Sequence, residues 1–150
     1  MKTLTICLVA AILLFACDKE CDLCFTPPPD FAFKIVDRQS GANLLDNEVY
    51  CPDSISLCYF ENEIEKDITL EFAINQYDEK LIYTNQLGWI AIKGITGFYL
   101  RLGHLDTDTM YLDISEMSDK CCTWFETRHF LINSKAPQYD QNTYAYLIEK

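Results

Sequence analysis

Eight cysteines are the residues of this 150-residue chain best suited to chemistry. A thiol can be acylated, oxidised to a disulfide or deprotonated to bind zinc, so the spacing of the cysteines decides among these uses. Cys7 lies within an apolar N-terminal stretch, and Cys17 follows that stretch. The remaining six form three close pairs, which are Cys21 with Cys24, Cys51 with Cys58, and Cys121 with Cys122.

The N-terminal segment has the pattern of a secretory signal peptide that ends at a lipidation site. Lys2 precedes an apolar stretch from Ile6 to Phe15, which is too short to span a bilayer. The residues just before Cys17 resemble a bacterial lipoprotein box, so we expect residues 1–16 to be removed and Cys17 to be acylated. The alternative is simple secretion, with Cys17 an ordinary residue beyond the cleavage site.

Residues 17–30 are predicted to form a tether between this anchor and the domain. The acidic run over residues 18–22 is typical of a solvated linker. The proline run over residues 27–29 favours a stiff polyproline II spacer, which would hold the domain away from the membrane.

The rest of the chain, residues 31–150, has the period-two alternation of half-buried strands. Residues 31–36, 55–60, 68–75, 98–102 and 110–114 alternate apolar and other side chains, with turn residues between them. Weaker candidates for strands are residues 81–84, 89–93, 122–133 and 144–148. We predict an all-β domain, an antiparallel β-sandwich of about eight strands, with a small closed β-barrel as the alternative.

Composition excludes two classes of protein. The chain has 12 Lys and Arg against 23 Asp and Glu, a net charge of −11, and 49% apolar residues. Binding to nucleic acid needs an excess of cations, and a disordered acidic linker would have fewer apolar residues.

Several segments resemble a group of small surface lipoproteins of the Bacteroidetes. The likeness lies in residues 24–29, 31–37, 40–45 and 106–109 and in the adjacent cysteines at 121 and 122. It implies an immunoglobulin-like β domain at the cell surface or in the periplasm, and it implies no ligand or reaction. The acidic run after Cys17 likewise resembles the export signal of surface lipoproteins in these bacteria. We therefore expect an outer-membrane, surface-exposed protein, with the periplasmic face as the alternative.

An even number of thiols in an exported domain predicts disulfides. The candidates are Cys21, Cys24, Cys51, Cys58, Cys121 and Cys122. The first two form a CxxC pair in the tether and are predicted to clamp the tether to the body, because no strand and helix flank them as in a redox motif. A local bridge could join Cys51 and Cys58, whereas Cys121 and Cys122 would point to opposite faces of a strand and find different partners.

Metal binding is the weaker alternative for these and other residues. The four sulfurs of residues 21, 24, 121 and 122 could bind zinc, with His104 and His129 as further ligands, but adjacent ligands fit a tetrahedron poorly. Asp106, Asp108 and Asp113 could bind calcium, although a hairpin turn explains the first two better. We interpret both histidines as ordinary structural or surface residues.

Two patterns could belong to a carbohydrate-active protein. The acidic run over residues 61–67 could supply paired carboxylates to a hydrolase, but it reads as a solvated loop. Tyr77, Tyr83, Trp89, Tyr99, Tyr111 and Trp124 could form an aromatic platform, although most are expected in the core or in cross-strand pairs.

These observations favour a non-catalytic, lipid-anchored binding or accessory module of the bacterial envelope, which needs no cofactor. Its partners would be the membrane, through Cys17, and an envelope protein or glycan. The alternatives are a small envelope hydrolase that uses paired carboxylates, and a metal-binding module.

Overall fold

The computed structural model describes residues 24–104 and 106–150. The predicted signal peptide, the lipidation site Cys17 and the disulfide candidate Cys21 lie outside these residues.

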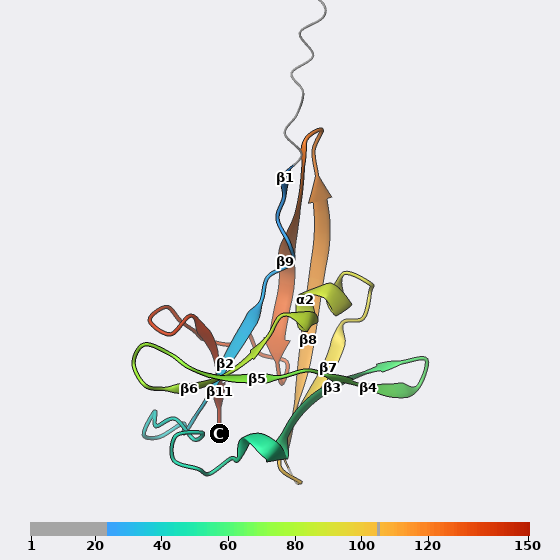
Figure 1. The fold of residues 1–150 in the computed structure, drawn as a ribbon. Coiled ribbons are helices and arrows are strands. Elements are labelled where there is room, and N and C mark those ends of the chain that lie inside the picture. The colour runs from blue at the N-terminus through green and yellow to red at the C-terminus, as the bar shows by residue number, and fades with distance from the viewer. Residues whose placement is uncertain (1–23, 105) are drawn as a thin grey trace, which may run out of the picture.

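Two β-sheets pack face to face and do not close into a barrel, which confirms the predicted all-β sandwich (Figure 1). The first sheet has the strand order β1 (Cys24–Phe25), β9 (Cys122–Ile132), β8 (Asp106–Ser118), β7 (Gly97–Leu102), β3 (Ile55–Glu61) and β4 (Ile64–Ile68). The second sheet has the order β10 (Tyr139–Asp140), β11 (Ala145–Glu149), β2 (Phe31–Val36), β6 (Lys80–Thr84) and β5 (Glu71–Ile74). Two short helices, η1 (Pro52–Ser54) and α2 (Gln86–Ala91), join strands.

Two pairs of strands are parallel, so both sheets are mixed. β1 runs parallel to β9, and β11 runs parallel to β2, while the other pairs are antiparallel. The two-residue strands β1 and β10 are too short to leave an alternating pattern. This explains why the described strands outnumber the predicted ones.

Residues 68–75 do not form the single predicted strand. β4 ends at Ile68 and belongs to the first sheet, whereas β5 begins at Glu71 and belongs to the second. The chain crosses between the sheets at residues 69–70, where the Gln86 side chain accepts a hydrogen bond from Thr69 N–H at 3.2 Å. The alternation continues through the crossing, so the pattern alone does not reveal it.

Helix α2 replaces the weak strand predicted over residues 89–93. Its Leu87 and Ala91 are four residues apart and both buried, so one helical face covers the core. A short apolar run is compatible with the period of a helix and with that of a strand, and this one forms a helix.

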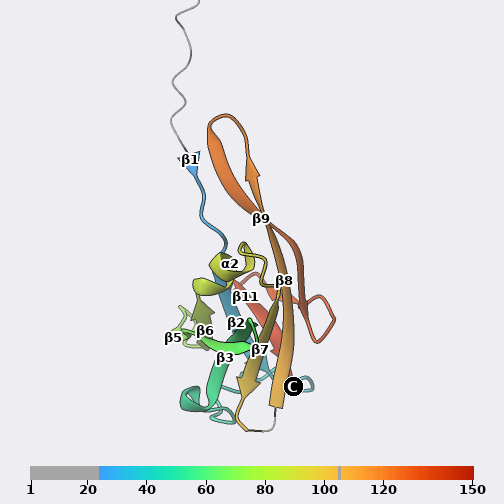
Figure 2. The same cartoon turned by 90° about the vertical axis from the view of Figure 1, so that its right-hand side faces the viewer.

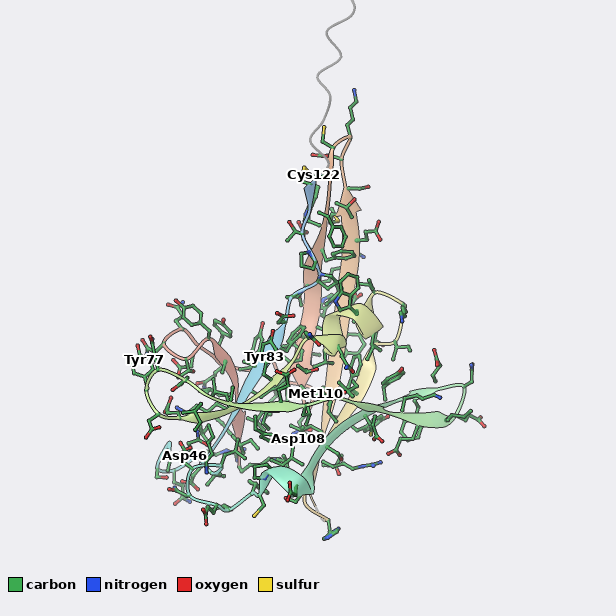
Figure 3. The ribbon with its side chains drawn as sticks, in the orientation of Figure 1. Asp46, Tyr77, Tyr83, Asp108, Met110 and Cys122 are labelled. Carbon is green, nitrogen blue, oxygen red and sulfur yellow. A yellow bond between two sulfur atoms is a disulfide. The ribbon has the colours of Figure 1, made fainter. Side chains whose placement is uncertain are left out.

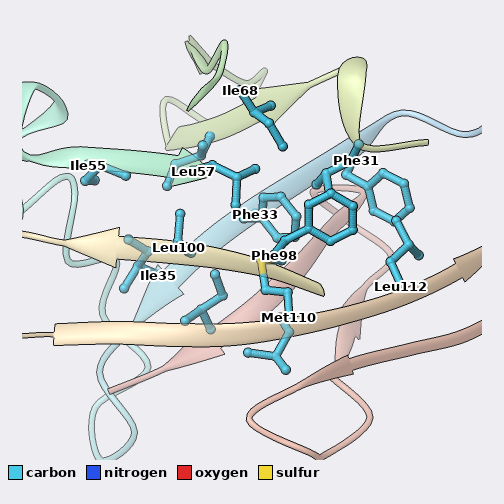
Figure 4. Packing of buried hydrophobic residues seen from close by; sticks show 14 of the residues in the cluster. Phe31, Phe33, Ile35, Ile55, Leu57, Ile68, Phe98, Leu100, Met110 and Leu112 are labelled. Carbon is cyan, nitrogen blue, oxygen red and sulfur yellow. The ribbon is translucent and has the colours of Figure 1, made fainter. Parts of the chain in front are cut away.

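The core lies between the sheets, around β2 (Figure 4). Phe31, Phe33 and Ile35 are almost fully buried, and they belong to one cluster with Leu57 of β3 and Leu100 of β7. Full burial of one such side chain contributes roughly 1.5–3 kcal/mol. These apolar positions of the alternating strands therefore face the core.

One end of the β8–β9 hairpin projects beyond the sandwich (Figure 2). β7 pairs with β8 only over residues 106–111, and residues 115–118 pair only with residues 123–126 of β9 among the described strands. We call residues 115–126 the arm, and residues 118–122 its tip.

The predicted proline spacer is packed onto the body. Pro28 is buried, and a Cβ atom added to Gly88 of α2 would lie 2.7 Å from Pro28 Cβ and 2.8 Å from Pro29 O. The described part of the tether therefore does not hold the domain at a distance. Because Gly88 has no side chain, the proline backbone can approach helix α2 closely. The sequence did not reveal this contact, since the two segments are far apart in the chain.

Candidate functional site

A disulfide joins the N-terminal segment to the tip of the arm. Cys24 bonds Cys122, with Cα atoms 4.5 Å apart and a sequence separation of 98. Cys24 N–H donates to Cys121 O at 3.1 Å, and Thr26 N–H donates to Thr123 O at 2.9 Å. This arrangement confirms that Cys24 clamps the tether to the body. Cys24 and Cys122 are therefore not available as thiolate ligands for the zinc site considered above.

Cys121 is disulfide-bonded too, and its partner lies outside the described residues. The cysteines there are Cys7, Cys17 and Cys21, all of which precede Cys24.

Asp119 shapes the loop that presents these two cysteines. Its Oδ1 accepts hydrogen bonds from Cys121 N–H at 2.8 Å and Cys122 N–H at 2.7 Å. These bonds lower the pKa of the Asp119 carboxyl. The sequence predicted only a turn here, although an Asp two or three residues before backbone donors is a recognisable signal.

An aromatic cluster fixes the same segment to the body. Phe25 stacks on Trp89 of α2 with ring centres 6.2 Å apart, and it meets Phe125 of the arm edge-on at 5.9 Å. Phe25 and Trp89 remain 58% and 41% exposed. Trp89, which was a candidate for a carbohydrate platform, thus helps to hold β1 in place.

Cys51 and Cys58 do not form the local bridge that the sequence left open. Cys51 is exposed and Cys58 is buried, and both are free. Burial raises the pKa of the Cys58 thiol, which lies in β3 beside the bidentate Arg101–Glu65 ion pair. Helix η1 follows Cys51 and leads into β3, so the turn does not fold Cys51 back onto Cys58.

The Asp106–Asp108 pair, the calcium alternative, already has a cationic partner. Lys150 Nζ lies 3.0 Å from Asp106 Oδ2 and 2.6 Å from Asp108 Oδ2, and Asn133 Nδ2 donates to Asp108 Oδ1. The contact between Lys150 and Asp108 Oδ2 is an ion pair. Tyr50 O–H donates to Asp106 Oδ2 at 3.0 Å, and burial, followed by this bond, raises the pKa of Tyr50. The carboxylates therefore join the C-terminus to β8.

The other metal and acid candidates lie apart. Asp113 is 3.7 Å from the exposed His129 Nδ1, whereas His104 lies near the base of β8. Within residues 24–104 and 106–150, no three His, Cys, Asp or Glu side chains gather as metal ligands do. In the acidic run over residues 61–67, the charged side chains are exposed and Glu65 pairs with Arg101, which lowers the pKa of Glu65.

The aromatic platform, considered as a possibility from the sequence, is not assembled among the described residues. Among the described residues, none of its six rings is in contact with another of the six. Tyr77 lies in the β5–β6 turn, far from the arm tip that carries Cys122, while Tyr83 lies in β6 (Figure 3). Tyr83 O–H donates to Asp30, and that bond raises the pKa of Tyr83 to about 12.

Two shallow cavities lie at the base of the β8–β9 hairpin, away from the arm tip. One, of about 300 Å³, is lined by Arg38, Lys135 and Glu149 over an apolar floor that includes Ile148. The other, of about 430 Å³, is lined by Cys51, Asp53, Arg101 and His104 among others. Neither is lined by Trp89 or Trp124, the two tryptophans considered for an aromatic platform.

Comparisons with protein families, with curated proteins and with solved structures find no match to this chain. Among the described residues, no helix has the length and apolar character needed to cross a membrane. The geometry alone therefore defines the candidate site. The N-terminal segment is fixed at the arm tip, and it does not reach the opposite end of the sandwich body.

Proposed function

We propose that the protein is a lipid-anchored display module of the bacterial envelope, which binds a partner without catalysing a reaction. The N-terminal sequence supports a signal peptide over residues 1–16 and acylation at Cys17. The acidic run after Cys17, together with the resemblance to lipoproteins of the Bacteroidetes, supports the outer face of the outer membrane.

The observation that carries this proposal is the attachment of the N-terminal segment to the arm tip through the Cys24–Cys122 disulfide. Cys24 is fixed there, and Cys17 precedes it by only seven residues, which span at most roughly 25 Å. An anchor at Cys17 would therefore hold the arm tip next to the membrane. The rigid hairpin, and not a proline spacer, would lift the sandwich body above it.

The same proposal assigns the second bridge. Cleavage would remove Cys7 and acylation would use Cys17, which leaves Cys21 as the partner of Cys121. Two bridges side by side would keep the arm upright and protect the tether against proteases, since a disulfide typically contributes about 2–4 kcal/mol.

Replacement of the anchor cysteine tests the proposal. Cys17→Ser in the full chain, with its own signal peptide, should move the protein from the membrane fraction to the soluble fraction. The matched control is Cys51→Ser, which removes an exposed free thiol and should leave the protein in the membrane fraction. Membrane retention of the Cys17→Ser protein would refute the anchor.

A further inference from the structure

The two sheets end in edge strands of different character, β4 and β5. β4 carries Glu65, Lys66 and Asp67 among its five residues, and such charges protect an edge against pairing with another chain. β5 has the sequence EFAI, and all four residues are exposed. Figure 2 shows β5 at the margin of its sheet, beyond β6.

The exposed residues of β5 are those that a sheet normally covers. Phe72 is 39% exposed and Ile74 is 65% exposed. They lie two residues apart, so their side chains share one face of the strand. Their partners across the ladder are Ile82 and Lys80 of β6, and no described strand lies on the other side.

The register shows which backbone groups point outward. Asn75 N–H donates to Glu79 O at 3.0 Å at the end of the ladder, and residues in antiparallel pairs alternate between bonded and non-bonded positions. Ala73 and Glu71 therefore bond to β6. The N–H and C=O groups of Phe72 and Ile74 face the open edge, where a further strand could bind them.

Carboxylates outnumber cations around this edge, where Lys80 of β6 is the cation opposite Ile74. Glu71 lies at one end of β5, Asp78 lies in the turn after it, and Asp30 lies beside Tyr83 of β6. None of these three carboxylates is in an ion pair with any described residue. A second copy of the chain would bring its own net charge of −11, so electrostatic repulsion opposes self-pairing and favours a cationic partner.

From these observations we propose that β5 is a docking edge for an extended segment of a partner protein, with apolar residues at its centre and Lys or Arg at its ends. The segment forms backbone hydrogen bonds to Phe72 and Ile74 and adds a strand to the second sheet. Its apolar side chains pack on these two residues, and its cations lie near Glu71 and Asp78. The inference deepens the proposed display function by naming the kind of partner that the displayed domain binds.

Direct binding to defined peptides tests the docking edge. The protein is the full chain with Cys17→Ser, secreted and oxidised, and the probe is a fluorescent, end-blocked peptide Lys-Thr-Val-Ile-Val-Thr-Lys. The matched peptide has Glu at both ends. Fluorescence anisotropy should show binding of the basic peptide, weaker binding at higher salt because of screening, and little binding of the acidic peptide.

Substitutions at the two edges give the control. Ile74→Lys adds a charge to β5, and Ile74→Pro removes an outward N–H without removing a ladder donor, so each should weaken binding about tenfold or more. Ile64→Lys changes a residue of β4 that is 59% exposed, and it should leave binding unchanged. Circular dichroism checks that each variant remains folded.

Several outcomes would overturn the proposal. They are equal binding of both peptides, no binding of the basic peptide, or binding that Ile74→Lys leaves intact. Sedimentation that reveals a dimer lost in Ile74→Lys would instead assign the edge to a second copy. Because the protein here has no anchor, failure of this experiment is distinct from failure of the membrane assay with Cys17→Ser.

Discussion

At the scale of single residues, the turn after β9 has a backbone conformation that its side chains disfavour. Asn133 and Ser134 have φ angles of 50° and 65°, and they join Ile132 to Lys135, which form an isolated bridge. Two residues in the left-handed region define a type I′ turn, for which Asn followed by Gly is preferred.

Ser134→Gly should therefore stabilise the protein. Glycine adopts a positive φ without the penalty of a Cβ atom, so the free energy of unfolding should rise by about 1 kcal/mol. Urea denaturation measures the change. Ser118→Gly, at the end of β8 and outside the left-handed region, is the control and should not stabilise. A lower stability of Ser134→Gly would contradict this interpretation of the turn.

Among single substitutions, the largest loss of stability is expected at the buried carboxylate of Asp108. Asp108 is 2% exposed and pairs with Lys150, which is also held by Asp106. Asp108→Ala leaves a largely buried ammonium with one partner fewer, so it should destabilise the fold by about 3 kcal/mol.

The control for Asp108 lies on the same strand. Asp113→Ala removes a carboxylate whose contact to the exposed His129 is loose, and it should change stability by less than about 0.5 kcal/mol. Adding Lys150→Met to Asp108→Ala should recover part of the loss. If the two Ala substitutions lowered the free energy of unfolding equally in urea denaturation, the buried network would contribute no more to stability than an exposed ion pair.

At the scale of elements, the contact between α2 and the proline segment decides how the tether is held. Gly88→Ala increases helix propensity by about 1 kcal/mol, yet its Cβ would lie 2.8 Å from the carbonyl oxygen of Pro29. Backbone atoms cannot move away as a flexible side chain would. We expect net destabilisation of about 1–3 kcal/mol and altered tryptophan fluorescence, since Trp89 lies next to Gly88 and contacts Phe25.

Gly97→Ala provides the comparison, because nothing lies within 4 Å of its added Cβ and its φ is not positive. Its stability should be close to that of the unmodified protein. If Gly88→Ala were as stable as Gly97→Ala, the proline segment would not be tightly packed on α2.

The helices and strands also show how much of the fold could be predicted from the sequence. Alternation predicts β7 and β8, because each buries one face and leaves the other in contact with solvent. It also predicts β2 and β3, although Lys34 and Cys58 on their other faces are buried as well. It misses α2 and the crossing at residues 69–70, since short apolar runs fit a helix or a strand equally well. The site depends on contacts remote in sequence, such as Cys24 with Cys122, and spacing alone left 15 pairings of six cysteines open.

At the scale of the whole molecule, the bridged cysteines and the two cavities lie at opposite ends. The arm tip carries the bridged cysteines and the chain that leads to Cys17, while both cavities and the free thiol Cys51 lie toward the base of β8. Helix η1, which follows Cys51, lies at the end of the molecule opposite the arm tip (Figure 1). A membrane anchor at one end would thus leave the other end and the β5 edge open to a partner.

Labelling of Cys51 on intact cells tests whether the domain is displayed at the cell surface. A membrane-impermeant maleimide should react with the exposed Cys51 and not with the buried Cys58, and Cys51→Ser should abolish the labelling. Our account predicts labelling of the membrane-bound protein on intact cells. Labelling only after the outer membrane has been permeabilised would place the domain on the periplasmic face and contradict surface display.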